Sequence, residues 1–339
     1  MPEPKSQCVA WIDILGIGSL THDSTAVARA EDILLKFQDL VFDEFRSDAA
    51  DGVEIYGIND GFYVRGPSVQ RICERVIAVF RRWFDERAES HENRPLLRGM
   101  VVHAPRDSVK SRAPIKHWLV GPGFSDAWSD ERLLRGGRLF RHPDLRHAGL
   151  AASLEFEWGS LSQAEMSPKD RSRSLIELLW PVDGCADTFL RRLEKSKRLH
   201  DAAFESYLAA DRKSPNLFMH YEETLKLHIR SAGKIIAGLT NQQSVENICA
   251  RLRDFCVPRD HPEHTWGLVF AALSAFFLAD RFDRDGFDGA YGFLATAHEK
   301  QTSRCPAKTW LEEFRRELRE PTYSDFRRWM TKHDQRFVG

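Results

Sequence analysis

Two apolar segments near the N-terminus, each joined to an aspartate, constrain the fold of this chain more than any other feature. Segment 8–20, CVAWIDILGIGSL, is an apolar run that ends on Asp13 and then breaks at two glycines. Segment 52–66, GVEIYGINDGFYVRG, holds two β-rich runs joined by Asn-Asp-Gly. An Asx-Gly pair between such runs is the strongest short-range hairpin signal. The sequence therefore predicts that Asp13 ends a strand and that Asp60 lies at a hairpin tip.

These two aspartates indicate a metal site if their strands are neighbours in one sheet. Their carboxylates would then meet at one edge, and hard divalent cations take oxygen ligands. Ordinary turn chemistry is the alternative explanation for Asp60, because Asn-Asp-Gly is a common turn sequence. Asp13 is harder to explain structurally, because it follows Val-Ala-Trp-Ile directly and has two glycines behind it.

Hydrophobic periodicity predicts a β-α-β-β-α-β order, which is that of a ferredoxin-like α+β sheet. Ser24 is the expected N-cap of the first helix. The elements expected after the first strand are a helix over Ser24–Arg46, the hairpin Val53–Val64, a helix over Val69–Arg87, a strand at Leu96–His103, a polar loop at Pro105–Pro114, a strand at Lys116–Val120 and a helix over Ser125–Leu134.

The second half of the chain is predicted to be mainly helical. Two further strands are expected first, at Leu154–Trp158 and Leu175–Pro181. The expected helices are Thr188–Leu208, Leu217–Leu239, Val245–Phe255, Thr265–Phe282, Trp310–Arg319 and Tyr323–His333. We therefore expect one domain over 1–183 and a helical region over 184–339, whose charged faces are solvated surface or, alternatively, a partner-binding surface.

Composition excludes several classes of function. The chain has 339 residues, 42% of them hydrophobic, and a formal charge of −1 from 49 basic and 50 acidic side chains. This balance argues against a general nucleic-acid or membrane-surface binder. The six cysteines form no C-x-x-C pair, which argues against a zinc site. The N-terminus is not a signal peptide and the longest apolar run, Leu268–Leu278, is too short to span a bilayer, so we expect a cytoplasmic protein.

Read together, these blocks resemble those of class III nucleotide cyclases. The matching blocks are Asp13-Ile14-x-Gly16, the hairpin with its second aspartate, and the strand Arg98–Val102. The run 121–128, GPGFSDAW, is similar to the Gly-Pro-Ala-x-Asn-Glu-Ala-Tyr type of stretch in the pyrimidine cyclases of bacterial Pycsar anti-phage systems. The resemblance covers roughly Val9 to Phe140.

The resemblance implies a two-metal site for nucleotide cyclisation. Asp13 and Asp60 would bridge two divalent ions, Mg or Mn, and Ile14 would offer its carbonyl. The residues themselves add a phosphate-binding turn, because backbone N–H groups between a strand and a helix can hold phosphate oxygens. Gly16 and Gly18 would let the backbone approach a triphosphate there.

Base selection is also implied by position. Purine cyclases of this class keep a Lys four residues before the hairpin acid, and Tyr56 stands there in this chain. Trp118 falls near a second base-contacting position. Both aromatic side chains would narrow the pocket and favour a pyrimidine, UTP or CTP; alternatively, both are core aromatics of a half-buried sheet.

The chain departs from the family at two positions. The family's Asn falls on Ser125, and the Arg that stabilises transition-state charge falls on Ser129, which cannot supply a cation. Spacing does not choose a substitute. The candidates are Arg98, Arg132, Arg135, and Arg106 or Arg112 of the partner subunit. For Arg98 the alternative is a structural ion pair with a neighbouring carboxylate.

Three functional hypotheses follow. The first is a homodimeric, metal-dependent cyclase that makes a cyclic pyrimidine monophosphate and pyrophosphate, the product being read by a separate effector protein in anti-phage defence. The others are an adenylate or guanylate cyclase, and a catalytically inactive cyclase fold that binds nucleotide or a partner. A two-metal nuclease or polymerase palm would want a third acid and a basic groove, and neither is evident.

Overall fold

The computed structural model describes the chain in a series of segments. They are residues 8–17, 25–87, 95–104, 108–112, 115–131, 135–142, 145, 150, 154–157, 175–210, 215–254, 268, 271–272 and 275. The chain divides into two compact units, one made of 1–180 and 198–224 and the other of 181–197 and 225–339. The separate division at residue 183, into a cyclase domain and a helical region, stays a prediction.

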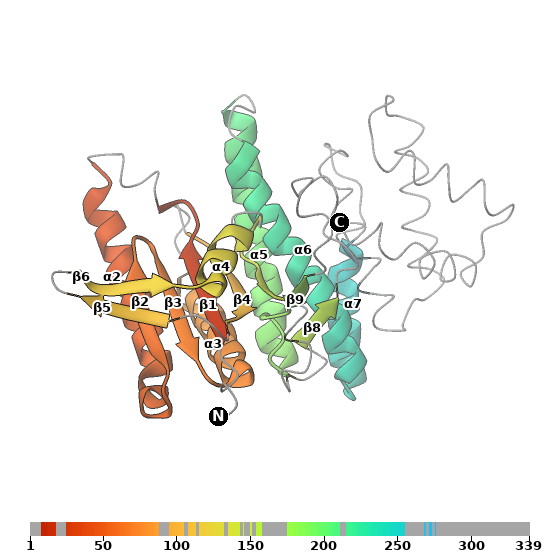
Figure 1. Ribbon diagram of the computed structural model, residues 1–339. Coiled ribbons are helices and arrows are strands. Elements are labelled where there is room, and N and C mark those ends of the chain that lie inside the picture. Colours follow the sequence, from red (N-terminus) through yellow and green to blue (C-terminus); the bar gives the residue numbers. More distant parts are fainter. Residues whose placement is uncertain are drawn as a thin grey trace, which may run out of the picture. The chain divides into compact units, whose positions relative to one another are not determined.

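A seven-stranded sheet forms the centre of the first unit (Figure 1). Its order is β2-β3-β1-β4-β7-β9-β8, antiparallel throughout except for the parallel pair β4 and β7. The strands are β1 (Cys8–Ile14), β2 (Glu54–Ile58), β3 (Gly61–Gly66), β4 (Leu97–His103), β7 (Leu139–Arg141), β8 (Glu155–Glu157) and β9 (Ile176–Leu178). The first four strands and two intervening helices have the ferredoxin-like arrangement, so the predicted α+β fold class is confirmed.

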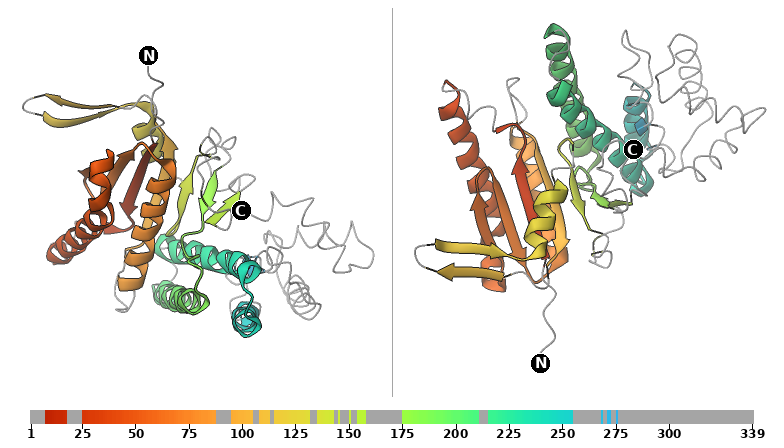
Figure 2. Two further views of the ribbon diagram at one scale, coloured as in Figure 1. Left: turned by 90° about the horizontal axis from the view of Figure 1, so that it is seen from below. Right: turned by 45° about the horizontal axis from the view of Figure 1, so that its top comes forward.

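Helices cover both faces of this sheet near β1 (Figure 2). On one face lie α2 (Val27–Phe45), the short helix η1 (Arg46–Asp51) and α3 (Val69–Arg87), where Phe37 stacks edge-on against Phe62 of β3. On the other lies α4 (Pro122–Glu131), whose Phe124 contacts Tyr63 of β3. We call this second side the α4 face. Because both faces are covered, every residue of β1 is buried.

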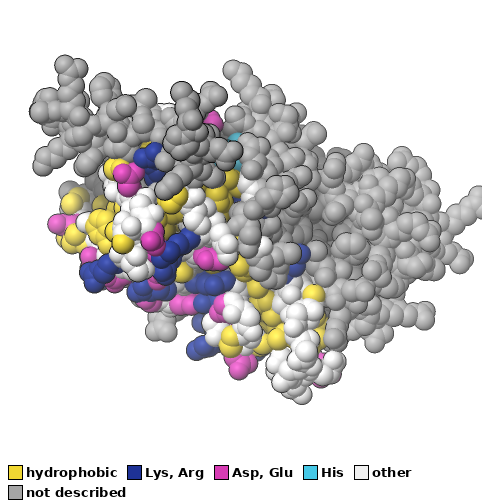
Figure 3. Space-filling model, turned by 60° about the horizontal axis from the view of Figure 1, so that its bottom comes forward, with side chains coloured by type: hydrophobic (Ala, Val, Ile, Leu, Met, Phe, Trp, Pro, Cys, Tyr) yellow, Lys and Arg dark blue, Asp and Glu magenta, His cyan; other side chains and the backbone are white. Residues whose placement is uncertain are grey.

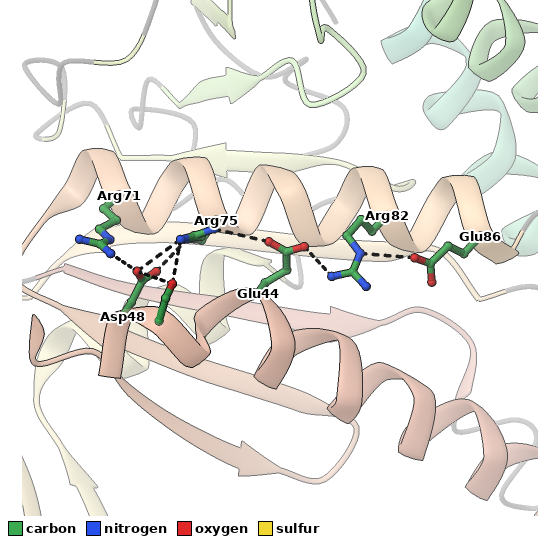
Figure 4. A network of polar contacts seen from close by, with 7 residues as sticks. Glu44, Asp48, Arg71, Arg75, Arg82 and Glu86 are labelled. Carbon is green, nitrogen blue, oxygen red and sulfur yellow. Dashed lines mark hydrogen bonds and ion pairs between the residues drawn. The ribbon is translucent and has the colours of Figure 1, made fainter. Parts of the chain in front are cut away.

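An ion-pair network joins α2 and η1 to α3 (Figure 4). Asp48 is fully buried and accepts hydrogen bonds from Arg75, while Arg71 pairs with the same carboxylate. Glu44 pairs with Arg82 at 2.7 Å. On the face drawn in Figure 3, basic and acidic side chains are interspersed instead of gathering into patches of one sign.

The expected elements of the N-terminal half differ from the structure in three places. Helix α2 begins at Val27 with Ala26 as an N-cap that makes no side-chain bond, so the N-cap prediction for Ser24 was wrong; Ser24 itself lies outside the described residues. The polar loop predicted at Pro105–Pro114 was also wrong. Residues Ser108–Arg112 form β5, which pairs with β6 (Ile115–Val120). These two strands form a separate sheet, and β6 confirms the strand predicted at Lys116–Val120.

The third difference is β7, which was not predicted. It has only three residues, too few for a period-2 pattern to show. The other elements are confirmed, with small shifts at their ends. Helix α3 spans Val69–Arg87 as expected, α4 begins three residues earlier than expected, and the strands predicted at Leu154–Trp158 and Leu175–Pro181 appear as the shorter β8 and β9.

Three long helices follow the sheet strands. They are α5 (Ala186–Ala209), α6 (Pro215–Gly238) and α7 (Gln242–Asp254), and they confirm three of the predicted helices. The helices predicted at Trp310–Arg319 and Tyr323–His333, and most of Thr265–Phe282, lie outside the described residues. None of the described helices is both long and apolar enough to cross a bilayer.

Candidate active site

The register of β1 brings the two aspartates together. Asp13 lies opposite Gly61 of β3 on one side and opposite Arg98 of β4 on the other. Asp60 directly precedes Gly61 at the hairpin tip, where Asn59 has a left-handed φ of 54°. Cross-strand partners share a sheet face, so Asp13 and Arg98 both belong to the α4 face. The structure therefore places both predicted metal-binding carboxylates at one end of β1.

Trp11 packs closely over Gly61, the cross-strand partner of Asp13. Its indole ring covers Gly61 so closely that a Cβ there would lie 2.4 Å from the ring and 2.8 Å from the carbonyl oxygen of Ile12. Only glycine fits at that position. Trp11 also packs against Tyr63, with 4.4 Å between ring centroids. On the same face of the sheet, Asp13 is only 7% exposed.

Asp13 is held in an electrostatically unfavourable place. Burial raises the pKa of its carboxyl, and the charge of Asp60 raises it further. Arg98 opposes these two effects, since its Nη2 and Nε lie 3.0 Å and 3.2 Å from the Oδ2 atom of Asp13. The result is a pKa of about 6 for Asp13. Arg98 therefore only partly compensates the effects of burial and of Asp60 on the Asp13 carboxyl.

This donor set fits a divalent cation. Carboxylate oxygens are the ligands that Mg²⁺ and Mn²⁺ favour, and a cation would relieve the repulsion between Asp13 and Asp60. Within the part of the chain that the structure describes, no group of three or more His, Cys, Asp or Glu side chains could hold a metal ion. Mg²⁺ commonly binds through only one or two carboxylates, with substrate phosphates completing its coordination. Asp13 and Asp60 are therefore the residues that would hold it.

The backbone turns away from the sheet directly after these residues. Ile14 is the last residue of β1, and the N–H of Leu15 donates to the carbonyl of Leu96 at 2.8 Å. Gly16 then adopts a left-handed φ of 86°, with open space where a Cβ would lie. This exposed turn is what the predicted phosphate-binding role requires. Gly18 lies outside the described residues.

Tyr56 lies on the same sheet face, two strands from Asp13. It is half-buried and stands opposite Tyr63 in the β2–β3 pair. Burial raises the pKa of its phenol to about 12, assisted by the charge of Glu54 and a hydrogen bond to it. Glu54 also pairs with Arg65 at 2.9 Å. The Tyr56 hydroxyl is therefore already oriented within a small polar group at the side of the site.

Helix α4 is fixed on the α4 face by Tyr63, whose hydroxyl donates to the carbonyl of Phe124 at 3.0 Å. The next residue, Ser125, is exposed. Trp118 lies on β6 opposite Lys110, away from the main sheet, and its side chain is outside the described part. Ser125 therefore lies on α4, the helix that covers the α4 face. Trp118 lies in the separate β5–β6 sheet, whereas Asp13 and Tyr56 lie in the main sheet.

A buried charge cluster beside Arg98 was missed by sequence reasoning. Arg138 lies beside Arg98 across the parallel β4–β7 pair, because Gly99 pairs with Leu139 and donates its N–H to the Arg138 carbonyl at 3.0 Å. Its guanidinium lies 2.6 Å from Glu177 and 3.5 Å from Glu223 of α6. Buried arginines are rare without partners, and these partners are tens of residues away in sequence. Nothing local in the sequence could have indicated this cluster.

Helix α6 also holds the turn that precedes β7. His220 Nδ1 accepts a hydrogen bond from the N–H of Gly136 at 2.9 Å, and Thr224 Oγ1 accepts one from Gly137 at 2.7 Å. Burial lowers the pKa of His220 to about 4, with the charges of Arg98 and Arg135 adding to the effect, so the imidazole is a neutral acceptor at pH 7. The first turns of α6 are therefore part of the scaffold behind Arg98.

Several solved nucleotide cyclases are similar to this chain. The adenylyl cyclase CyaB from P. aeruginosa is 14% identical, covering 53% of this chain and 94% of its own, with a TM-score of 0.40. An adenylate cyclase from Trypanosoma brucei has 11% identity, 53% and 92% coverage and a TM-score of 0.40. The guanylate cyclase domain of RhGC from Catenaria anguillulae, in complex with GTP, has 12% identity, 51% and 95% coverage and a TM-score of 0.38. No family model and no curated protein matches the chain.

Proposed function

We propose that this protein is a metal-dependent nucleotide cyclase. The observation that carries the proposal is the pairing of Asp13 and Asp60 at the end of β1, where burial and mutual repulsion keep the pKa of Asp13 at about 6. A fold with only structural requirements gains nothing from two adjacent carboxylates in a largely buried corner. A divalent cation bound there explains both residues at once.

The reaction is an in-line displacement at the α-phosphorus. The ribose 3′-oxygen forms a bond to the α-phosphorus, its proton passes to solvent, and the bond to the bridging oxygen breaks to release pyrophosphate. Bound cations would stabilise the entering and leaving oxygens. Asp13 and Asp60 would hold these cations at the end of β1, and the turn at Gly16 would offer backbone N–H groups to the phosphate chain.

We further propose that the substrate is a pyrimidine nucleoside triphosphate, UTP or CTP. Tyr56 supports this, because it stands where the resembling purine cyclases keep a base-contacting lysine. Its hydroxyl, hydrogen-bonded to Glu54, would read the edge of the base. The role of the product as a second messenger in anti-phage defence is part of the same proposal and comes from the resemblance to Pycsar cyclases.

The proposed active form is a head-to-tail homodimer. Class III cyclases build their sites between two subunits, and this chain carries one such unit. The position of the transition-state arginine is taken by Ser129, so the partner subunit's Arg106 or Arg112 remains a candidate for that charge. A C2 dimer would complete two equivalent sites. Light scattering at assay concentration should give twice the monomer mass, and an active monomer would contradict the proposal.

The direct test is incubation of the purified protein with all four nucleoside triphosphates and Mn²⁺, with products identified by mass spectrometry. We expect cyclic UMP or cyclic CMP with pyrophosphate, and none from the Asp13→Asn variant. A cyclic purine product would replace the pyrimidine proposal with a purine cyclase. Nucleotide binding without any product would favour an inactive cyclase fold, which the serines at 125 and 129 would then explain.

The role of Tyr56 can be separated from its packing. Tyr56→Phe removes the hydroxyl that bonds Glu54 and should weaken discrimination among the four bases. Tyr63→Phe is the matched control, because the Tyr63 hydroxyl is engaged by the Phe124 carbonyl. The control should lower stability without changing the product ratio. An unchanged ratio in Tyr56→Phe would mean that Tyr56 does not read the base.

A further inference from the structure

Arg98 donates twice to a single oxygen of Asp13. Its Nε lies 3.2 Å and its Nη2 3.0 Å from Oδ2, so both donors use one carboxylate oxygen. A common alternative is bidentate pairing, in which an arginine spreads its donors over both oxygens of the acid. Arg98 instead concentrates its charge on one atom of the residue that would also hold a divalent cation.

The charges around Arg98 would allow a cation to displace its guanidinium from the Oδ2 atom of Asp13. On one side lies Asp13, whose carboxyl is acted on by the opposed charges of Asp60 and Arg98. On the other side lies Arg138, a like charge directly before the neighbouring strand β7, and its own partners are Glu177 and Glu223. The charges of Arg98 and of Glu223 both act on His220, so the guanidinium of Arg98 and the carboxylate of Glu223 both lie near that imidazole. Arg98 is also more exposed than its partner, its side chain being 20% accessible.

We propose that Arg98 is an exchangeable counter-ion that occupies Oδ2 of Asp13 in the metal-free protein and competes with the divalent cation for it. This inference rests on the proposed function, since it requires a cation at Asp13 and Asp60. Arg98 stabilises the metal-free fold by compensating the buried carboxylate. Binding of the cation releases the guanidinium towards Glu223 or the incoming triphosphate. Arg98 thereby lowers metal affinity while keeping the empty corner folded.

The test is a Mn²⁺ titration without nucleotide, by isothermal calorimetry, on the full chain. Arg98→Met should bind Mn²⁺ about tenfold more tightly than wild type, on the scale of one half-buried ion pair. Arg65→Met is the matched control. Arg65 lies on the same sheet face, is 16% accessible and pairs with Glu54 at 2.9 Å. Its removal should leave Mn²⁺ affinity unchanged.

Thermal unfolding supplies the second readout. Arg98→Met should unfold at a lower temperature than wild type without metal, and the difference should disappear at saturating Mn²⁺. Equal or weaker Mn²⁺ affinity in Arg98→Met would overturn the proposal. Should Arg98→Met fail to fold, Arg98→Lys replaces it in the test. This variant keeps the positive charge but loses the double donation, so it should still bind Mn²⁺ more tightly than wild type. Equal or weaker affinity in Arg98→Lys would also overturn the proposal.

Asp13→Asn separates this inference from the proposed function. Loss of Mn²⁺ binding in Asp13→Asn, together with unchanged affinity in Arg98→Met, would leave the metal site standing and overturn only the role of Arg98. Wild-type affinity in Asp13→Asn would overturn both, because the cation would then bind elsewhere.

Discussion

Two buried aspartates in the same unit, each beside arginine, have opposite electrostatic environments. Asp48 lies where η1 meets α3, and Asp13 lies at the end of β1. Burial would raise the pKa of Asp48, but hydrogen bonds from Arg75 and Arg71 outweigh it and lower the pKa below its ordinary value. At Asp13 burial and Asp60 outweigh Arg98, and the pKa rises to about 6.

On the proposed function, this difference separates a structural charge, Asp48, from the charge proposed to bind a cation, Asp13. Asp48 pairs with two arginines, Arg71 and Arg75, and these ion pairs join η1 to α3 (Figure 4). Asp13 has too little positive charge around it and sits beside an exposed glycine turn. Strongly perturbed groups collect at functional sites, because binding or catalysis requires charges that the fold alone would avoid.

The largest expected effect is on activity. Asp13→Asn and Asp60→Asn should each lower cyclase activity by roughly 1,000-fold or more, because each removes a carboxylate that holds the cations. The free energy of unfolding should stay the same or rise slightly without metal, since one of two repelling charges is removed. Product formation and chemical denaturation, measured on the same preparations, check both parts. Activity near that of wild type in either variant would remove the two-carboxylate site.

The converse variant is Asp48→Asn. It should lower the free energy of unfolding by about 3 kcal/mol, since it leaves two arginines without their buried partner. The value lies at the low end for such pairs because Arg75 and Arg71 are 34% and 41% accessible to water. Mn²⁺ affinity of the folded protein should match wild type. A loss of Mn²⁺ binding in soluble, folded Asp48→Asn would erase the distinction between the two aspartates.

A third variant tests the close packing behind Arg98. In Gly136→Ala the new Cβ would lie 2.8 Å from Glu223 Cβ and 2.9 Å from the His220 carbonyl oxygen, in addition to the strain of a φ of 81°. Gly52 has the same φ of 81° with open space around it, so Gly52→Ala reports the backbone strain alone. We expect a loss of roughly 1–2 kcal/mol for Gly52→Ala and about 1–3 kcal/mol more for Gly136→Ala. Equal losses would mean that α6 yields easily at this contact.

The smallest expected effect is a difference in pH dependence. The folded pKa of Asp13, about 6, exceeds its ordinary value of 3.8, so its contribution to stability is full below pH 3.8 and is lost as pH rises through 6. The folded pKa of Asp48 is lowered, so its contribution is present above pH 3.8 and is lost only as pH falls through that lower value.

Melting temperatures at pH 5 and pH 7.5, without metal, compare the two directly. Wild type should lose stability relative to Asp13→Asn between these pH values, whereas its advantage over Asp48→Asn should stay constant. Should the wild-type and Asp13→Asn curves run parallel, the carboxyl of Asp13 does not titrate in this range.

The fold of the first unit could be predicted from sequence because its signals are local. The apolar run before Asp13 and the Asn-Asp-Gly turn each specify a strand end, and pairing them specifies where two carboxylates meet. The helix Val69–Arg87 was predicted to the residue, because its apolar stripe begins and ends sharply. Strand β6 agrees with the strand predicted at Lys116–Val120, whereas its partner β5 was expected to be a loop because Pro105–Pro114 is polar and basic in sequence.

The scaffold behind the site could not be predicted, because its contacts are non-local. Arg138 is paired with Glu177 and Glu223, 39 and 85 residues away. His220 was in a segment expected only to be helical, and its hydrogen bond to Gly136 spans 84 residues. The resemblance ends near Phe140, so it gave no indication that a helix beyond residue 200 lies behind Arg98.

The central claim is that the Asp13 corner binds a divalent cation and the Asp48 cluster does not. Its most direct measurement is a Mn²⁺ titration followed by electron paramagnetic resonance, in which free Mn²⁺ is counted for wild type, Asp13→Asn and Asp48→Asn. We predict saturable binding in wild type and Asp48→Asn, and its loss in Asp13→Asn. Equal binding by wild type and Asp13→Asn, or no saturable binding in wild type with nucleoside triphosphate present, would contradict the claim.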